Sequence, residues 1–121
     1  MTSDLPLLGF GLPVSGRWAT PDTIVRIARR AEELGYASLW TFQRVLNPAG
    51  GALGTAHESV LDPVLPLALV AGHTERIRLG TATVCAPFIS PALLAKTMTS
   101  LDVLSGGRLN VGLGMGWMPE E

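Results

Sequence analysis

Two groups of residues have types and spacing that could bind or transform a ligand. Gln43 and Arg44 follow an apolar run, and a guanidinium in that place could bind an anionic ring or a phosphate, or could be a solvated loop charge. The glycine series from Gly112 to Trp117 lacks both the spacing of a dinucleotide fingerprint and the lysine of a P-loop. It therefore either lets a flat ring approach the backbone or forms a tight strand-to-helix turn.

The histidines and the single cysteine give little support for metal binding or nucleophilic catalysis. His57 and His73 have no second His, Cys or carboxylate at ligand spacing, so we expect no metal site. His57 lies in a predicted loop, where it could contact a substrate. Nothing near Cys85 marks it as an activated nucleophile, so we expect it to pack as a small apolar side chain.

The composition excludes several classes of protein. A chain that is 47% hydrophobic and 16% charged is not disordered, and a net charge of −1 does not attract nucleic acid or anionic lipid. One cysteine fits a reducing cytosol, no apolar run is long enough to span a membrane, and the N-terminus does not resemble a signal peptide. We therefore expect a cytoplasmic chain that binds neither nucleic acid nor membrane.

Glycine and proline divide the chain into alternating strand and helix signals. Helices are predicted where Thr20-Pro21 and Ser90-Pro91 provide a cap followed by proline, and also a few residues after Asp62, because Pro66 disfavours an earlier start. The first of these helices ends at Gly35. Short apolar runs predict strands over residues 5–12, 36–42, 77–84 and 108–114.

Strands that alternate with helices predict a parallel sheet covered by helices. Two architectures remain open on this pattern alone, namely a doubly wound sheet and part of a (β/α)8 barrel. Both bind ligands at the carboxyl ends of their strands. The residues that follow each strand are therefore the candidates for function.

Four stretches in order along the chain resemble the luciferase-like monooxygenase superfamily, particularly the branch that uses the deazaflavin coenzyme F-420. They are Ala31-Glu32-Glu33-Leu34-Gly35-Tyr36 running into Ser38-Leu39-Trp40-Thr41; Arg76-Ile77-Arg78-Leu79-Gly80-Thr81-Ala82; Ser90-Pro91-Ala92-Leu93-Leu94-Ala95-Lys96; and Leu101-Asp102-Val103-Leu104-Ser105-Gly106-Gly107-Arg108 running into Gly112-Leu113-Gly114-Met115-Gly116-Trp117. Each motif alone is modest, and the ordered combination is specific.

This resemblance implies a (β/α)8 barrel that binds FMN or coenzyme F-420 at its C-terminal mouth, of which residues 1–121 would form a single partial domain ending after the fourth strand. It also implies a cis peptide bond between Ala82 and Thr83 at the end of the third strand. The cofactor-binding residues that we expect are Gln43, Ala82, Thr83, Cys85, Met115 and Gly116.

The chain also departs from the family pattern. Gln43-Arg44 replaces the Asp-His of some relatives, and Trp117 stands where some relatives have a carboxylate, which argues against sugar-phosphate dehydrogenation. We expect an oxidoreductase that uses coenzyme F-420, or alternatively FMN, for hydride transfer or oxygen insertion on a small organic substrate. Arg44 and Glu120 are the candidate catalytic residues.

A competing hypothesis is that the chain is a non-catalytic assembly or partner-binding module. An ordinary barrel of this kind needs about 250 residues. Four strands alone would expose two sheet edges, and such edges invite pairing or aggregation. We therefore expect the isolated chain not to be a stable monomeric enzyme: either it is the first segment of a longer product or it associates through its edges. Luciferase-like proteins are commonly dimers, so a homo-oligomer is expected.

Overall fold

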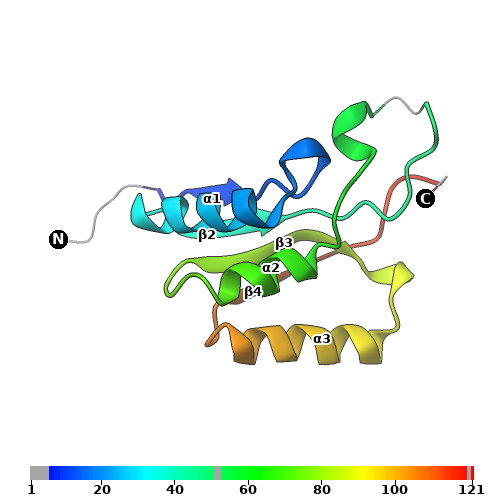
Figure 1. Ribbon diagram of the computed structural model, residues 1–121. Helices are drawn as coiled ribbons and strands as arrows, with labels where there is room; N and C mark the ends of the chain where they lie inside the picture. The colour runs from blue at the N-terminus through cyan, green and yellow to red at the C-terminus, as the bar shows by residue number, and fades with distance from the viewer. Residues whose placement is uncertain (1–5, 51–52, 120) are drawn as a thin grey trace.

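The computed structural model describes residues 6–50, 53–119 and 121. Figure 1 shows strands and helices that alternate along the chain. The strands are β1 (Gly9–Gly11), β2 (Ser38–Thr41), β3 (Arg78–Cys85) and β4 (Leu109–Gly114), and the helices are α1 (Pro21–Glu33), α2 (Val64–Ala71) and α3 (Pro91–Leu104). Short 3-10 turns lie at η1 (Gly16–Trp18), η2 (Thr55–His57) and η3 (Ala86–Phe88).

The four strands form one parallel sheet in the order β1-β2-β3-β4, which confirms the predicted α/β class. The three helices lie on the same side of this sheet, and α2 contacts both α1 and α3 (Figure 1). A doubly wound sheet reverses its strand order and carries helices on both faces. Consecutive strands with helices on one side are instead the winding of a (β/α)8 barrel.

The helix boundaries follow from local capping. Thr20 Oγ1 accepts the backbone N–H of Thr23 at 3.3 Å, and Gly35 has a φ of +83°, so α1 begins and ends close to the predicted positions. Asp62 Oδ1 accepts the N–H of Val64 at 2.8 Å, which confirms that α2 starts a few residues after Asp62. Ser90 is the N-cap residue of α3 and Pro91 its first helical residue, as predicted, although the Ser90 side chain makes no capping hydrogen bond.

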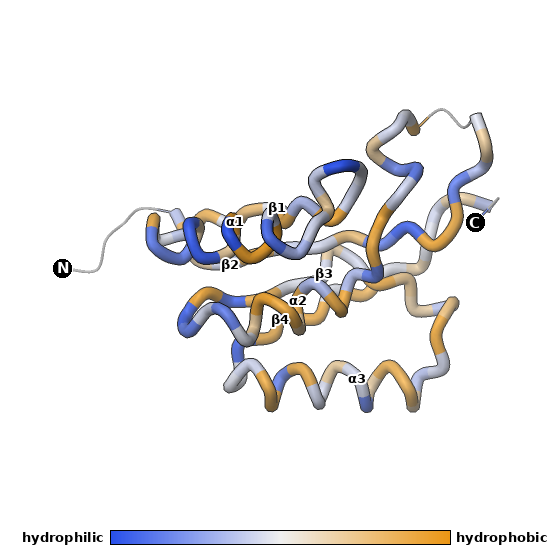
Figure 2. Tube along the Cα trace, in the orientation of Figure 1, coloured by the Kyte–Doolittle hydropathy of each residue, from blue (hydrophilic) through white to orange (hydrophobic). Residues whose placement is uncertain are grey.

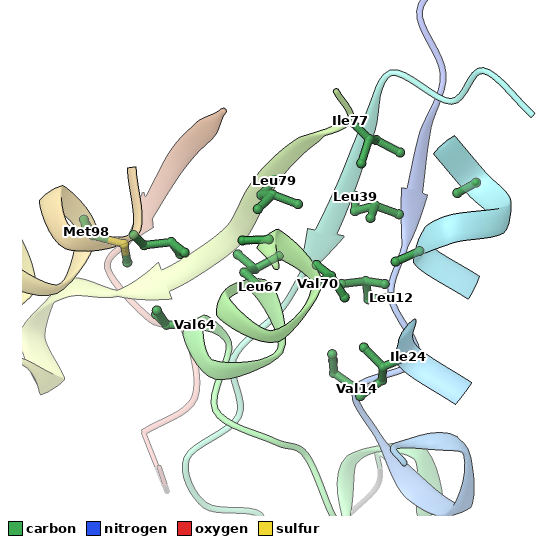
Figure 3. Close-up of a cluster of buried hydrophobic side chains, with 14 of the residues drawn as sticks. Leu12, Val14, Ile24, Leu39, Val64, Leu67, Val70, Ile77, Leu79 and Met98 are labelled. Atoms are coloured by element: carbon green, nitrogen blue, oxygen red, sulfur yellow. The ribbon is translucent and has the colours of Figure 1, made fainter. Parts of the chain in front are cut away.

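The core lies between the helices and one face of the sheet. Leu39 on β2 pairs in register with Leu79 on β3, and both are fully buried against Leu67 and Val70 of α2 (Figure 3). The residues of α2 are apolar throughout, whereas α1 alternates between hydrophobic and hydrophilic residues (Figure 2). The middle helix is thus the one that neighbours enclose on several sides, as a uniformly apolar helix requires. No helix among the described residues is long and apolar enough to cross a membrane.

No helix among the described residues covers the opposite face of the sheet. Trp40 lies flat across it, because Gly9 and Gly80 on the two neighbouring strands leave no side chain in its way. A Cβ at Gly9 would approach Trp40 Nε1 to 2.6 Å, and the indole N–H donates to Ser38 Oγ at 2.8 Å. The glycines of β1 and β3 thus make room for one large ring on this face.

Glu32 of α1 holds the amino-terminal end of the sheet. Its carboxylate accepts the backbone N–H groups of Arg76, Ile77 and Glu75 at 2.7, 2.8 and 3.0 Å. Partial burial by itself raises the pKa of this carboxyl. The three N–H donors and the positive charge of Arg76 outweigh that effect, so the pKa of Glu32 lies below its ordinary value.

Arg108, just before β4, fastens the same end. Its guanidinium donates to the carbonyl oxygens of Ala71 at 2.9 Å, Ile77 at 3.1 Å and Ser105 at 2.6 Å, and to Thr74 Oγ1 at 2.9 Å. One side chain therefore supplies donors to the carbonyls at the end of α2, the end of α3 and the start of β3, which would otherwise be partly buried without partners.

Candidate functional site

A cavity of about 380 Å³ lies at the carboxyl ends of β2, β3 and β4. The described residues that line it are Phe42, Gln43, Arg44, Ala82, Thr83, Cys85, Gly114, Met115, Gly116, Trp117 and Glu121. The six expected cofactor-binding residues and Arg44 are all in this set, whereas His57, the possible substrate contact, is not. Glu120, the other catalytic candidate, lies outside the described residues. The segments that follow β2 and β4, far apart in the sequence, meet at this end of the molecule (Figure 1).

The floor of the cavity is an irregular part of β3. The peptide bond between Ala82 and Thr83 is cis, as the family resemblance implied. The pairing of β3 with β4 shifts register between Thr81 and Val84, so the strand carries a bulge at this point. Bulges re-aim side chains at the rims of barrels and beside functional sites.

The bulged part of β3 approaches β4 so closely that two positions of β4 have no room for a side chain. A Cβ at Gly112 would overlap the carbonyl oxygen of Thr81, and one at Gly114 would overlap Thr83 Oγ1. Gly116 has a φ of +80°, and its Cβ would lie 2.9 Å from Cys85 Sγ. Neither interpretation of the glycine series was complete, because Gly112 and Gly114 serve strand packing and only Gly116 has the positive φ that favours glycine.

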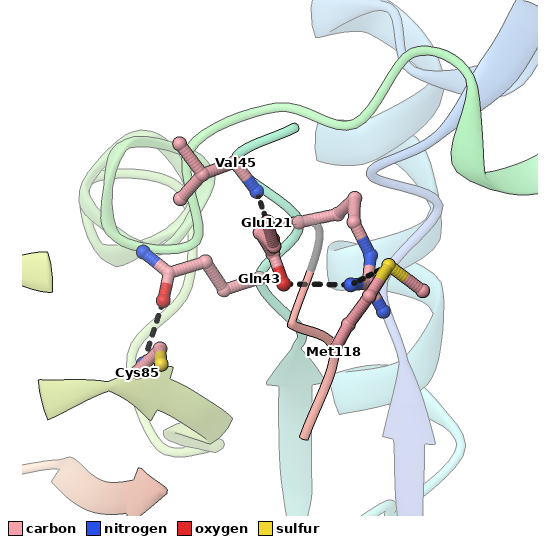
Figure 4. A network of polar contacts seen from close by, with 6 residues as sticks. Gln43, Val45, Cys85, Met118 and Glu121 are labelled. Carbon is pink, nitrogen blue, oxygen red and sulfur yellow. Dashed lines mark hydrogen bonds and ion pairs between the residues drawn. The ribbon is translucent and has the colours of Figure 1, made fainter. Parts of the chain in front are cut away.

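Gln43 is fixed by a hydrogen bond across the cavity floor. The backbone N–H of Cys85 donates to Gln43 Oε1 at 2.6 Å (Figure 4). An N–H can pair only with the oxygen of the amide, so the contact determines which way the amide faces. The Gln43 Nε2 group points away from Cys85 in Figure 4 and makes no hydrogen bond with the described residues. Its two N–H donors therefore have no partner among the described residues.

Arg44 is neither a solvated loop charge nor an open anion site. Its Nη1 lies 2.7 Å from Glu121 Oε2, and the two side chains are only 7% and 9% exposed. The second oxygen of Glu121 accepts the N–H of Val45 at 2.6 Å (Figure 4). The Arg44 guanidinium also lies 5.5 Å from the centroid of the Trp117 ring, within the range of a cation–π contact. The interpretation of Arg44 as a solvated charge is therefore wrong.

Sequence reasoning missed Glu121. Arg44 and Glu121 are 77 positions apart, and no spacing rule links a loop arginine to a glutamate at that separation. The available signal was topological: the segments after β2 and β4 leave the same edge of a parallel sheet, so opposite charges in those segments can meet.

The loop after β2 contains unsatisfied polar atoms. Among the described residues, the buried side-chain nitrogen and oxygen atoms without a hydrogen-bond partner are Arg44 Nε, Asn47 Oδ1 and His57 Nδ1. His57 packs edge-on against Phe42, with ring centroids 5.6 Å apart, but does not itself line the cavity. Across the described ranges, no three His, Cys, Asp or Glu side chains gather as a metal site would require.

A larger groove of about 540 Å³ lies on the outer surface between α1 and α2. It is lined by Arg26, Arg29 and Arg30 together with His73, whose Nδ1 lies 3.1 Å from Arg29 Nη2. No residue that the sequence marked for function lines this groove. The cavity at the strand ends is therefore the candidate site, although it is the smaller of the two.

Comparison with known proteins agrees with the fold. The model of the family described as luciferase-like monooxygenase matches residues 7–121. The oxygenase component of flavin-dependent trigonelline monooxygenase from Acinetobacter baylyi is 32% identical over 95 residues, which cover 78% of this chain and 24% of that protein. An F-420-dependent glucose-6-phosphate dehydrogenase from Amycolatopsis mediterranei is 30% identical over 113 residues, covering 91% of this chain and 32% of that protein.

A solved structure shows the same arrangement of elements. The monooxygenase RslO1 from Streptomyces bottropensis superposes with a TM-score of 0.77 at 29% identity, covering 95% of this chain and 35% of that one. The chain spans less than half of the length of the curated relatives that it matches, between 24% and 43% in the strongest matches. The resemblance thus extends over the described sheet, its helices and the cavity.

Proposed function

The chain belongs to the luciferase-like monooxygenase family, and from that premise we propose that it forms the coenzyme-binding part of an oxidoreductase that acts on a small organic substrate. The observation that carries this proposal is the cavity of about 380 Å³ at the strand ends, which gathers Gln43, Thr83, Cys85 and Met115 from three separate segments. Ligand pockets of (β/α)8 barrels form at this end of the strands.

The residues present fit a planar ring. The cavity volume is within the range of small-molecule sites, and its wall combines apolar surface from Phe42, Met115 and Trp117 with few polar groups. Ala82 and Gly116 contribute almost no side chain. Gln43 offers amide donors whose direction is already fixed by Cys85. A flat ring with acceptor atoms on one edge suits this set of walls and donors.

We propose coenzyme F-420 as the ring, with FMN as the alternative. When bound, either coenzyme supplies hydride chemistry, and reduced FMN also supplies oxygen activation. The part of the chain is to bind and orient: Gln43 would donate one of its two Nε2 hydrogens to an acceptor on the ring edge, and the backbone of Ala82 and Thr83 would support the ring. Trp117 and Met115 would provide apolar surface on the other side.

The candidate catalytic residues take different places in this proposal. Arg44 is held by Glu121 and contacts Trp117, so it positions the wall of the site rather than transferring a proton. Glu120 stays a candidate acid–base group. The alternative that the chain is only an assembly module is not favoured, because the matched relatives with a described activity are monooxygenases and a dehydrogenase. We also propose that the protein self-associates, which light scattering after size-exclusion chromatography tests directly.

Titration of the protein with coenzyme F-420 and with FMN, followed by coenzyme fluorescence, tests the proposal. We expect one of the two to bind with micromolar affinity. In Gln43→Leu, the dissociation constant should rise about tenfold, which corresponds to the loss of one hydrogen bond of about 1.4 kcal/mol.

The matched control is Lys96→Leu, which replaces an exposed polar side chain of α3 far from the cavity. It should leave the dissociation constant within twofold of the starting value. Absence of binding of both coenzymes, or equal effects of the two leucine substitutions, would contradict the proposed function.

A further inference from the structure

We infer, on the basis of the function proposed above, that Glu121 makes the site selective for a substrate with an uncharged group. Glu121 does so by pairing with the Arg44 guanidinium, which an anionic substrate group would otherwise bind. The two charged side chains among the described residues of the cavity wall are Arg44 and Glu121, and they pair with each other. The charges of these two side chains therefore cancel on the described part of the wall.

The pair is closed to a competing anion. Arg44 and Glu121 are 7% and 9% exposed, so the guanidinium presents almost no surface to the cavity. A carboxylate or phosphate would have to displace Glu121 and would leave that carboxylate buried without its cation. Removing one partner from a buried ion pair is strongly unfavourable, because the remaining charge has neither water nor a counter-ion.

Glu121 is itself fastened in place. Its Oε1 accepts the backbone N–H of Val45 at 2.6 Å while Oε2 holds Arg44. The guanidinium is also bracketed by the sulfur of Met118 at 3.6 Å and by the ring of Trp117. A backbone donor does not move with a side-chain rotamer, so the carboxylate keeps its place when Arg44 fluctuates. These contacts keep the Arg44 charge neutralised by Glu121.

Gln43 provides an uncharged donor on this wall. Gln43 Oε1 is committed to the Cys85 N–H, so the amide presents its Nε2 donors and no acceptor to the other side. A neutral donor pairs well with a carbonyl, hydroxyl or ether oxygen without requiring the desolvation of an ion. The substrate class is therefore an uncharged organic molecule with an acceptor oxygen, and not a phosphorylated or carboxylated one.

The test compares benzamide with benzoate, two flat molecules of the same shape that differ in charge. Isothermal titration calorimetry of the protein should give benzamide an affinity at least tenfold above that of benzoate. In Glu121→Gln, benzoate affinity should rise at least tenfold, while benzamide affinity changes less than threefold. The probes need no coenzyme, so failure of this inference is distinguishable from failure of the coenzyme titration.

Two further variants test whether the effect comes from this ion pair or only from the change in overall charge. Glu33→Gln removes the same charge from the exposed Arg30–Glu33 pair on α1, so it matches the change in overall charge and should leave both affinities unaltered. Arg44→Gln should act in the opposite sense, because it leaves Glu121 without its cation. It should raise the affinity for protonated benzylamine at least tenfold and should not improve benzoate binding.

The result that supports the inference is preference for benzamide in the starting protein together with reciprocal gains for benzoate and benzylamine in the two variants. Equal binding of benzamide and benzoate, no binding of either, or unchanged charge preference in both variants would overturn it. If Glu121→Gln does not fold, the Arg44→Gln arm decides alone.

Discussion

The two ends of the sheet both use a glutamate to join segments that are distant in the sequence, but the two glutamates are satisfied differently. At the amino-terminal end, Glu32 accepts three backbone N–H groups, and Arg108 supplies donors to three carbonyl oxygens. At the carboxyl-terminal end, Glu121 accepts one backbone N–H, from Val45, and pairs with the Arg44 guanidinium. The loop beside that pair contains the unsatisfied buried atoms of Arg44, Asn47 and His57.

This difference in hydrogen bonding suggests that the amino-terminal end serves stability and the carboxyl-terminal end serves function. At the amino-terminal end, three backbone N–H groups and three carbonyl oxygens find charged partners in Glu32 and Arg108, and such charge-assisted hydrogen bonds rigidify what they connect. The carboxyl-terminal end leaves donors and acceptors without partners, and a fold tolerates such groups where a ligand or a partner segment makes use of them. Substitutions at the two ends should therefore separate in what they change.

The largest expected effect is at the amino-terminal end. Arg108→Ala should lower the free energy of unfolding by about 3 kcal/mol, because several partly buried carbonyl groups lose their donor together. Urea denaturation followed by circular dichroism measures this change. Arg26→Ala, which removes an exposed arginine of α1, is the control and should change stability by less than about 0.5 kcal/mol. A loss for Arg108→Ala no larger than that of the control would break the comparison.

Glu32→Gln should cost about 1.5 kcal/mol at neutral pH, because an amide oxygen replaces a carboxylate that accepts three N–H groups. The effect should depend on pH. The pKa of Glu32 in the folded protein lies below its ordinary value of 4.5, so the stabilisation is complete above about pH 5 and is lost as the pH falls through the folded-state pKa.

Urea midpoints of the starting protein and of Glu32→Gln, measured between pH 7 and pH 3, should therefore converge towards the acid end. A difference that stays constant over this range, or that widens as the pH falls, would contradict the assigned role of the carboxylate.

Gln43→Leu tests the carboxyl-terminal end of the sheet. The Cys85 N–H loses its partner, so we expect a stability loss of about 1 kcal/mol, well below that of Arg108→Ala. The same substitution should weaken coenzyme binding about tenfold, whereas any coenzyme binding by folded Arg108→Ala should be nearly unchanged. Urea denaturation and fluorescence titration of both variants check that Arg108→Ala loses more stability and Gln43→Leu loses more coenzyme affinity.

The smallest effect belongs to the exposed pair on α1. Arg30 and Glu33 lie 3.1 Å apart, but their side chains are 66% and 63% exposed. Solvent-exposed pairs at this helical spacing contribute about 0.5 kcal/mol or less. Glu33→Gln should therefore shift the urea midpoint barely above experimental error, and any remaining shift should disappear in 1 M salt.

The sequence predicts the fold well and the site unevenly. Caps at Thr20 and Asp62, glycine punctuation and apolar runs locate the helices and strands within a few residues, because these signals are local. The six residues expected to bind the coenzyme meet in one cavity because the ends of parallel strands lie together. The partner of Arg44 escaped prediction, since it depends on a contact across 77 positions that no local pattern encodes.

The close approach of β4 to the bulged part of β3 constrains how such a protein diversifies. Gly112 and Gly114 have no room for any side chain, so the inner edge of this strand offers no positions at which selection can adjust specificity. Variation must instead enter through the chain that follows β2 and β4, where Arg44, Trp117 and Glu121 lie. We therefore expect substitutions that change the substrate to lie in these two segments and not at Gly112 or Gly114.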